Sequence, residues 1–438
     1  MDRRRFVGAV AAAAGTVGSS EKLAAQGGAP VRSTPLKPDY WGPQYYDQQE
    51  RQQLNDVLET GRPFRWYGRG DEPPMKVATF EKEFAARMNT KYALAVTSGT
   101  AALEAAMAAL QIGPGDEVII PAWTWHSSAT SVIRAGALPV FADVDESFNI
   151  DPADIEHRIT PKTKLIMAVH LQGCPSDMDK VLAIARKHKI RVLEDCAQAV
   201  GGSYKGKPLG SMGDISIYSH QLNKTITAGE GGALVTNDPV LFERAARFHD
   251  LGALRGLHGS MLGTPKLDVF VGANYRMNEF SGGVMLAQLR KLDRIVSAVR
   301  GNAQRVYDGI KDLPGIRFRH RPDPAGDMGT VVFVRFDSKV RCDRFIKLMT
   351  AENVPVAPPG GSVVLPNLPY IINKVTVHPD WPTWTSARGK AIKYGPDTCR
   401  QTLDILSRFA GPYMDPKYTR RDTDDIIAAI RKVYPQVG

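Results

Sequence analysis

From Tyr92 onward, short apolar runs alternate with turns and helical stretches, and this pattern limits the possible folds more than any other feature. The run YALAV precedes the turn TSGT and the alanine-rich AALEAAMAAL, which ends at GPG. The runs DEVIIPA, LPVFADV, TKLIMAVHL and IRVLEDCA follow, with helical stretches such as MDKVLAIARKHK between them. Strands that alternate with helices predict an α/β fold with a parallel sheet covered by helices on both faces.

Length and charge limit the class of protein. The chain has 438 residues, of which 43% are hydrophobic and 23% charged, so it can bury a substantial core in two or three domains. Its formal net charge is +10, but the basic residues are scattered and no aromatic-interleaved basic stripe stands out. We therefore expect no nucleic-acid partner, and we interpret the charge as favouring solubility and attracting small anions.

The cysteines argue against metal and redox sites. The chain has four widely spaced cysteines, Cys174, Cys196, Cys342 and Cys399, and none of them forms a CxxC pair. We expect no metal ion. The sequence leaves a Cys342–Cys399 disulfide open without demanding it.

The N-terminus has the layout of a secretory signal. Residues 1–27 combine a charged start, a short and mildly apolar stretch and a run of small residues, too short for a membrane span. The run RRRF at residues 3–6 fits a twin-arginine signal, although Asp2 replaces the usual Ser or Thr and LAA at 23–25 is an imperfect cleavage site. We predict export to the periplasm or beyond, with a cytoplasmic leader as the alternative and no membrane contact for the mature protein.

Two domains are expected after this leader. A large domain with a Pro-rich N-terminal arm would occupy residues 28–300, and a long helical region would connect it to a smaller α+β domain at residues 301–438. The section from about Ala357 to Tyr394 contains tryptophans and basic residues. It either lines the mouth of a substrate site or is a surface loop with buried aromatic anchors.

Two turns carry residues suited to binding a flat, phosphorylated ligand. In a doubly wound sheet, ligands bind beyond the carboxyl ends of the strands. The turn TSGTAAL opens a helix whose free N–H groups can bind phosphate, and the alternative is that Ser98 or Thr100 serves only as a helix cap. The turn PAWTWHSS contains Trp123, Trp125 and His126, and an indole there could stack on a heteroaromatic ring or belong to the core.

Two further turns supply a carboxylate and an amine. Asp195 follows a buried apolar run, where a carboxylate can hold the protonated ring nitrogen of a cofactor or cap a helix. Lys224 lies before the turn GEGG, and near a carbonyl-bearing cofactor its amine could form a Schiff base rather than remain a surface charge. Ser219 could donate to the same phosphate. The four turns together contain the residues that pyridoxal 5'-phosphate requires.

Several phrases in one order carry a family resemblance. They include FEKEFAARMNTKYALAVTSGTAALEAAMAALQIGPGDEVIIPAWTW, VHLQGCPSDMD, EDCAQAVGGSYKGKPLGSMGD, KTITAGEGGALVT and NYRMNE. The chain resembles the pyridoxal-phosphate-dependent sugar aminotransferases of the DegT/StrS family, from about Val31 through the bridging helix and more loosely beyond it. The resemblance implies the aspartate-aminotransferase fold (type I), with a three-layer α/β/α large domain and a smaller C-terminal α+β domain.

The resemblance implies two catalytic residues and two contacts to the cofactor ring. Lys224 would form the Schiff base with the cofactor and then move a proton between substrate carbon and cofactor. Asp195 would pair with the ring nitrogen and keep it protonated. Gln198 would lie near the ring hydroxyl, and Trp125 would stack on the face of the ring.

The resemblance also implies the phosphate contacts and a dimer. Gly99, Thr100 and Ser219 would bind the phosphate, and Asn274 would reach the phosphate of a neighbouring subunit, so the active unit would be a homodimer. His170 would lie near the site without a defined role.

One position indicates the substrate class. Three residues before the lysine, many nucleotide-sugar enzymes of the family carry His, whereas this chain carries Gln221. Glutamine there resembles the branch that acts on cyclitols and aminohydroxybenzoate-type rings. We therefore expect a transaminase that moves an amino group from glutamate or glutamine to a keto-sugar or keto-cyclitol. The alternatives are a non-catalytic relative that binds the cofactor and a sugar dehydratase, although dehydratases of this fold replace the lysine with His.

Overall fold

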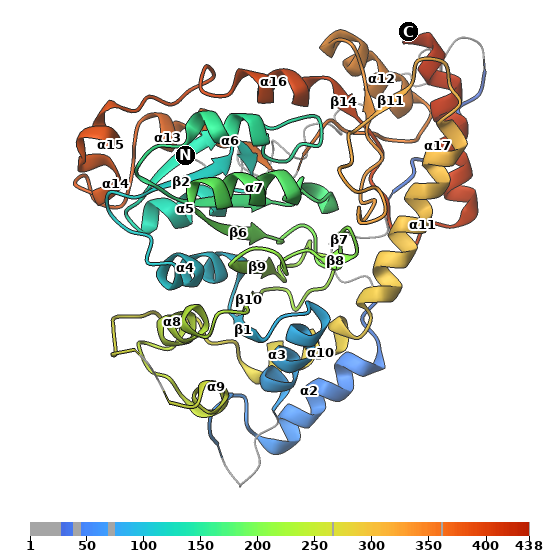
Figure 1. The fold of residues 1–438 in the computed structure, drawn as a ribbon. Coiled ribbons are helices and arrows are strands. Elements are labelled where there is room, and N and C mark those ends of the chain that lie inside the picture. The colour runs from blue at the N-terminus through green and yellow to red at the C-terminus, as the bar shows by residue number, and fades with distance from the viewer. Residues whose placement is uncertain (1–27, 38–44, 69–74, 265–266, 361, 438) are drawn as a thin grey trace.

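A seven-stranded mixed sheet forms the centre of the molecule (Figure 1). The computed structural model describes residues 28–37, 45–68, 75–264, 267–360 and 362–437, so the expected leader and its cleavage site lie outside the described residues. The strand order is β1-β10-β9-β6-β5-β2-β4, and only β10 runs antiparallel to its neighbours in this sheet. The strands are β1 (Tyr92–Val96), β2 (Glu117–Pro121), β4 (Leu138–Ala142), β5 (Thr163–Val169), β6 (Arg191–Asp195), β9 (Ile215–Ser219) and β10 (Gly232–Thr236).

Helices cover both faces of this sheet because alternate strand residues point to opposite sides. In β1, Leu94 and Val96 join the hydrophobic cluster of one face, whereas Ala93 and Ala95 join that of the other. The first face is covered by α4 (Gly99–Ala109), α5 (His126–Arg134) and α8 (Pro239–His249). The second is covered by α3 (Lys76–Arg87), α6 (Pro152–Arg158), α7 (Met178–His188) and α10 (Glu279–Leu289). The expected three-layer α/β/α arrangement is confirmed.

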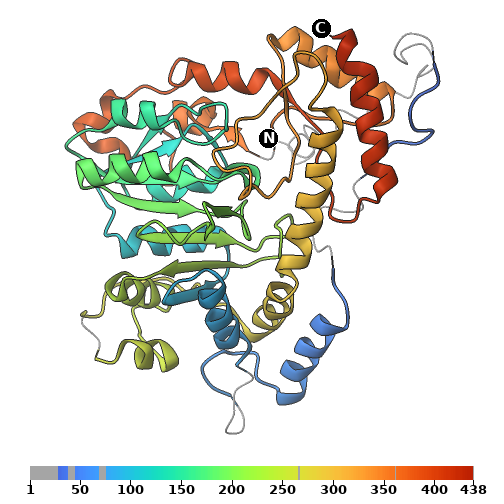
Figure 2. The same cartoon turned by 45° about the vertical axis from the view of Figure 1, so that its right-hand side comes forward.

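A long helix connects this unit to a second core. Helix α11 (Leu292–Ile310) contains residue 300, the expected domain limit, and leads to a three-stranded sheet (Figures 1 and 2). Val299, Val306 and Leu36 of the N-terminal arm share one hydrophobic cluster with that sheet. The elements are β11 (Arg317–Phe318), β12 (Val334–Arg335), β14 (Phe409–Ala410), α12 (Lys339–Ala351) and α17 (Arg420–Val433).

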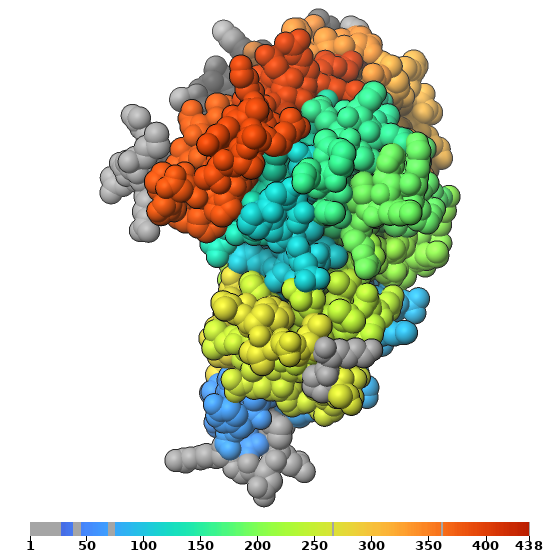
Figure 3. Space-filling model, turned by 60° about the vertical axis from the view of Figure 1, so that its left-hand side comes forward, coloured from blue at the N-terminus to red at the C-terminus, as the bar shows by residue number. Residues whose placement is uncertain are grey.

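Part of the C-terminal region returns to the large domain. Strand β13 (Val363–Val364) pairs with β3 (Trp123–Thr124), and Trp384 and Tyr394 are buried in the cluster of the first sheet face. Figure 3 shows this orange to red stretch lying against the cyan part of the large domain. The section 357–394 thus contains buried aromatic anchors. Its strand β13 pairs with β3, which belongs to the expected site turn PAWTWHSS. Its helices are α13 (Pro369–Ile372), α14 (Pro382–Thr385) and α15 (Ala387–Ala391), followed by α16 (Arg400–Ser407).

Smaller elements complete the large domain. Helix α2 begins with a capping box, in which the Asp47 side chain accepts a hydrogen bond from the Glu50 backbone N–H and the Glu50 side chain accepts one from the Asp47 backbone N–H. Glu50 also forms an ion pair with Lys291, just before α11. The remaining elements are α2 (Gln48–Thr60), α9 (Gly256–Leu262), β7 (Ser203–Tyr204) and β8 (Lys207–Pro208).

The cysteines are unpaired in this fold. All four are free and buried, with Cys342 in the core of the second domain and Cys399 in the cluster of the large sheet. The Cys342–Cys399 pairing that the sequence left open is therefore not formed. Within the described part of the chain, no helix combines the length and apolarity needed to cross a bilayer.

Candidate active site

The predicted site residues gather where strands end. Thr100 follows β1, Trp125 follows β3, and Gln198 follows β6, which ends with Asp195 itself. Lys224 lies in the loop that follows Ser219, the last residue of β9. Because β1, β5, β6 and β9 run in the same direction, these turns meet at one edge of the sheet.

The turn after β1 forms a phosphate-type cradle. Ser98 is the N-cap of α4 and accepts a hydrogen bond from the Ala101 N–H at 3.0 Å. Thr100 does not cap the helix, because its hydroxyl contacts the Ser127 hydroxyl at 2.9 Å. A Cβ added to Gly99 would lie 2.7 Å from the Ser219 Cβ, so only glycine allows the two turns to approach so closely. The start of α4 and Ser219 are therefore held side by side, with helix N–H groups suited to an anion.

Asp195 is a buried carboxylate with few partners. It accepts hydrogen bonds from the Ser128 hydroxyl at 3.1 Å and from the Ala197 N–H at 3.0 Å. Burial raises the pKa of Asp195, and the Ala197 N–H, the charge of Lys224 and the Ser128 hydroxyl offset this only in part. No helix begins there, so Asp195 is not a helix cap. A protonated ring nitrogen would supply the cation that this carboxylate lacks.

Lys224 lies in a closed loop between β9 and β10. The His220 N–H donates to the Gly231 carbonyl at 2.8 Å, and the Leu222 N–H donates to the Gly229 carbonyl at 2.9 Å. Gly229 has a φ of 83°, which the turn requires. Burial lowers the pKa of Lys224, opposed in part by the charge of Asp195. A lowered pKa raises the fraction of neutral amine, the form that attacks a carbonyl.

The two tryptophans of the turn PAWTWHSS have different environments. Trp123 is fully buried in the core, whereas the side chain of Trp125 is 51% exposed at the start of α5. The Trp125 ring meets His126 edge-on at 5.2 Å, and His126 Nδ1 lies 2.8 Å from the Tyr370 hydroxyl. The exposed indole of Trp125 is available for stacking on a ring, and Trp123 is the core residue.

Gln198 contacts two residues that the sequence did not single out. Its Oε1 accepts a hydrogen bond from the Gln172 N–H at 3.0 Å, and its Nε2 donates to the Ser362 hydroxyl at 3.1 Å. Gln172 has a left-handed φ of 52° and donates from Nε2 to the Gly360 carbonyl at 2.9 Å. The motif VHLQG contains Gln172, but no sequence signal connects Gln198 to Ser362.

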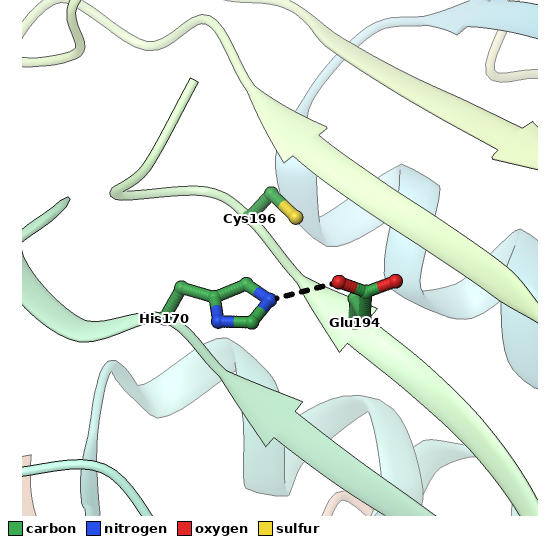
Figure 4. Close-up of side chains that lie close together, drawn as sticks. All are labelled: His170, Glu194 and Cys196. Carbon is green, nitrogen blue, oxygen red and sulfur yellow. Dashed lines mark hydrogen bonds and ion pairs between the residues drawn. The ribbon is translucent and has the colours of Figure 1, made fainter. Parts of the chain in front are cut away.

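His170, Glu194 and Cys196 lie close together beneath the site (Figure 4). His170 Nδ1 accepts from the Ser176 N–H, so Nε2 carries the proton and donates to Glu194 at 3.0 Å. The Glu194 carboxylate also accepts from the backbone N–H groups of Gly210, Met212 and Gly213.

The donor atoms of this cluster are thus already used. Burial raises the pKa of the Cys196 thiol well above its usual value, so the thiol stays protonated at neutral pH. These contacts describe a buried hydrogen-bond network that holds the loop before β9, and a metal ion would have to break it. The His170 side chain belongs to this network, and the His170 backbone N–H donates to the Asp195 carbonyl at 3.1 Å.

Asn274 stands apart from the other predicted residues. It forms an isolated bridge with Asp250, and its side chain is exposed.

The described residues fit pyridoxal 5'-phosphate on their chemistry. Asp195 is a buried carboxylate with no ion-pair contact among the described residues, Lys224 is a buried lysine with a lowered pKa, and a glycine-lined helix start adjoins a serine hydroxyl. A family model for the DegT/DnrJ/EryC1/StrS aminotransferases matches residues 44–359. The chain belongs to the DegT/DnrJ/EryC1/StrS aminotransferase family. It is a pyridoxal-phosphate-dependent aminotransferase, as the sequence predicted.

Relatives of this aminotransferase include enzymes named for several acceptors. The chain is 39% identical over 394 residues to the spore coat polysaccharide biosynthesis protein SpsC of Bacillus subtilis, covering 88% of this chain and 94% of that one. It is 37% identical to the L-glutamine:2-deoxy-scyllo-inosose aminotransferase of Micromonospora echinospora, covering 66% and 69%. It is 36% identical to the GDP-perosamine synthase of Vibrio cholerae, covering 61% and 70%. The matches to two other GDP-perosamine synthases span 64% and 58% of those proteins.

Solved structures of aminotransferases share the fold. The aminotransferase from Psychrobacter cryohalolentis aligns with a TM-score of 0.75 at 29% identity, covering 92% of this chain and all of that chain. The structure of 3-amino-5-hydroxybenzoic acid synthase aligns with a TM-score of 0.74 at 27% identity, with the same coverage.

Proposed function

We propose that this aminotransferase moves an amino group from glutamate or glutamine to the ring ketone of a keto-cyclitol or keto-sugar. The observation that carries the proposal is the pair of buried groups at the sheet edge, the Asp195 carboxylate and the Lys224 amine, each of which shifts the pKa of the other. In the reaction the donor leaves as a 2-oxo acid, and the acceptor ketone becomes an amine.

Bound pyridoxal phosphate supplies a carbonyl that captures amines and a ring that withdraws electrons from the reacting carbon. Asp195 would hold a proton on the ring nitrogen, and the hydrogen bonds that it accepts from Ser128 and Ala197 fix the direction of the carboxylate. Lys224, with its lowered pKa, would take a proton from the donor carbon and pass it to the cofactor in the first half of the exchange. In the second half it would move a proton the opposite way, from the cofactor to the acceptor carbon.

The phosphate and the ring each have their own set of residues in this proposal. The helix start at Gly99 and Thr100, together with the Ser219 hydroxyl, binds the phosphate. The exposed Trp125 indole would stack on the ring, and Gln198 would contact the ring hydroxyl. Contacts at both ends of the cofactor would hold it in place beside Lys224.

Two observations favour a cyclitol as the acceptor. Gln221 stands three residues before Lys224 and belongs to the same loop, where its Oε1 accepts from the Asn223 N–H at 2.9 Å. One relative is named as an inosose aminotransferase that uses glutamine. The experiment is to incubate the holoenzyme with glutamine and a panel of keto-cyclitols and keto-sugars, and to detect the amine product by mass spectrometry. Amination of no ring ketone, with the cofactor bound, would contradict the proposal.

We propose that two copies of the chain form the active unit. Several exposed apolar side chains precede the exposed Asn274 in the sequence, namely Leu251, Leu257, Met261, Val269 and Val271. Val271 is 93% exposed, and a second copy would remove such apolar surface from water. Asn274 would then reach the phosphate bound by the partner, and sedimentation of the pure protein as a monomer would contradict this.

We also infer export through the twin-arginine route from the RRRF run at residues 3–6. A reporter fused to residues 1–27 should leave the cytoplasm only in cells with an intact twin-arginine system. Retention of the reporter in such cells would contradict export.

A further inference from the structure

A segment of the C-terminal region reaches Gln198 through Ser362. Its position is fixed by the short strand that follows it: Val363 pairs with Thr124, Val364 pairs with Trp123, and the Leu365 N–H donates to the Ala122 carbonyl at 2.7 Å. This pairing joins the segment to the strand that leads directly into Trp125. Ser362 is therefore held beside β3, which continues the chain from β2 of the large sheet.

The two contacts of Gln198 allow only one orientation of its amide. The Gln172 backbone N–H is a donor, so it must meet the oxygen of the amide, as it does at 3.0 Å. The nitrogen then faces Ser362, whose hydroxyl accepts at 3.1 Å. A flipped amide would set its NH2 group against the Gln172 N–H, donor against donor. The second N–H of Gln198 takes part in no hydrogen bond among the described residues.

Gln172 holds the same segment from a second point. Its left-handed backbone is fixed at the carbonyl, which accepts from the Thr330 hydroxyl. Its Nε2 donates to the Gly360 carbonyl at 2.9 Å, two residues before Ser362. More than nine-tenths of the Gln172 side chain is buried, so this contact is protected from water. The bonds thus form one connected set that runs from Gly360 through Gln172 and Gln198 to Ser362.

We propose that Ser362 is a positioning residue that fixes the Gln198 amide so that its free N–H faces the ring oxygen of bound pyridoxal phosphate. The proposal rests on the proposed function for the location of Gln198 beside the ring hydroxyl. Through Ser362 the C-terminal segment, which follows the residues matched by the family model, would tune the electronic state of the cofactor.

The consequence is a change in the acid–base behaviour of the bound cofactor. An N–H that donates to the ring oxygen stabilises negative charge on that oxygen. Negative charge on that oxygen grows when the cofactor chromophore loses its proton. Loss of the Gln198 N–H as a donor therefore makes this deprotonation harder and raises the pKa of the chromophore. A hydrogen bond of ordinary net strength corresponds to about half to one pH unit.

The experiment is a pH titration of the cofactor's visible absorption band in holoenzyme variants. Ser362→Val removes the hydroxyl. Ser362→Thr keeps the hydroxyl on a side chain of about the same volume as valine. We expect the midpoint to rise by about half to one pH unit in Ser362→Val and to stay at the wild-type value in Ser362→Thr. Ser407→Ala is the matched control, because its hydroxyl donates to Asp404 within its own helix, and it should leave the midpoint unchanged.

A double-mutant cycle tests whether the effect passes through Gln198. Adding Ser362→Val to Gln198→Leu should shift the midpoint no further than Gln198→Leu alone. An equal midpoint for Ser362→Val and Ser362→Thr, or an undiminished shift in the Gln198→Leu background, would overturn the proposal. The proposed function is tested apart from this, by whether wild-type holoenzyme reacts with amino donors at all.

Discussion

Gly99 gives a quantitative test of how the phosphate turn is built. An alanine there would place its Cβ 2.7 Å from the Ser219 Cβ, 3.1 Å from the Ser219 Oγ and 3.3 Å from the Ser219 Cα. Real Cβ atoms do not approach other atoms at 2.7 Å, so α4 and the end of β9 must move apart. Overpacking of this kind costs about 1–3 kcal/mol. We expect Gly99→Ala to lower the free energy of unfolding by that amount and to weaken cofactor binding.

The matched control is Gly301→Ala. Gly301 lies within α11, where an added Cβ meets nothing within 4 Å, so alanine should stabilise the helix by about 0.5–1 kcal/mol. Urea unfolding of the cofactor-free proteins and titration with pyridoxal phosphate measure both effects. Ser219→Gly added to Gly99→Ala should recover stability, because it removes the atom that clashes. Equal stability and equal cofactor affinity for the two single variants would refute the steric reasoning.

Three further predictions concern the carboxylates and the proposed interface. Asp195→Asn should keep the fold but bind the cofactor more weakly and react at least 100-fold more slowly, because an amide cannot hold the ring proton by charge; cofactor titration and single-turnover rates measure this. Burial acts to raise the pKa of Glu194, but His170 and backbone N–H groups outweigh it and leave the pKa lowered. The ionised Glu194 therefore stabilises the fold above about pH 4.5, and this stabilisation is lost as the pH falls through the lowered pKa of Glu194. We expect Glu194→Gln to lower the free energy of unfolding by about 3 kcal/mol at pH 7 and by less at acid pH, as measured by unfolding at both pH values. Val271→Asp should shift sedimentation toward the monomer, whereas Val340→Asp, on the exposed face of α12, should not.

The sheet, and the meeting of the predicted turns at one of its edges, could be predicted because their signals are local. The apolar run that ends at Asp195 and the turn after Lys224 are contiguous in sequence, and parallel strands bring their ends to one edge whatever the details of packing. The antiparallel direction of β10 has no such signal, since it depends on how the loop that contains Lys224 closes. The domain limit at residue 300 and the leader at residues 1–27 stay predictions.

The contacts that Gln198 makes with Ser362 and Gln172 could not be predicted, for a physical reason. Gln198 and Ser362 are 164 residues apart, and the strand that brings them together contains only Val363 and Val364. A pairing of two residues leaves no periodicity to detect. Gln172 could not be predicted for another reason. Its carbonyl accepts a hydrogen bond from the Thr330 hydroxyl, which is distant in sequence, and this contact holds the left-handed backbone of Gln172.

The central claim is that Lys224 acts with pyridoxal phosphate to remove an amino group from a donor. The most direct measurement is the absorption spectrum of the pure holoenzyme before and after addition of glutamate and then of glutamine, with Lys224→Ala as the comparison. We predict that the visible band of the wild-type cofactor gives way to a band at shorter wavelength as one equivalent of 2-oxo acid is released, and that Lys224→Ala releases none. A visible band that neither donor changes, or 2-oxo acid release by Lys224→Ala at the wild-type rate, would contradict the account.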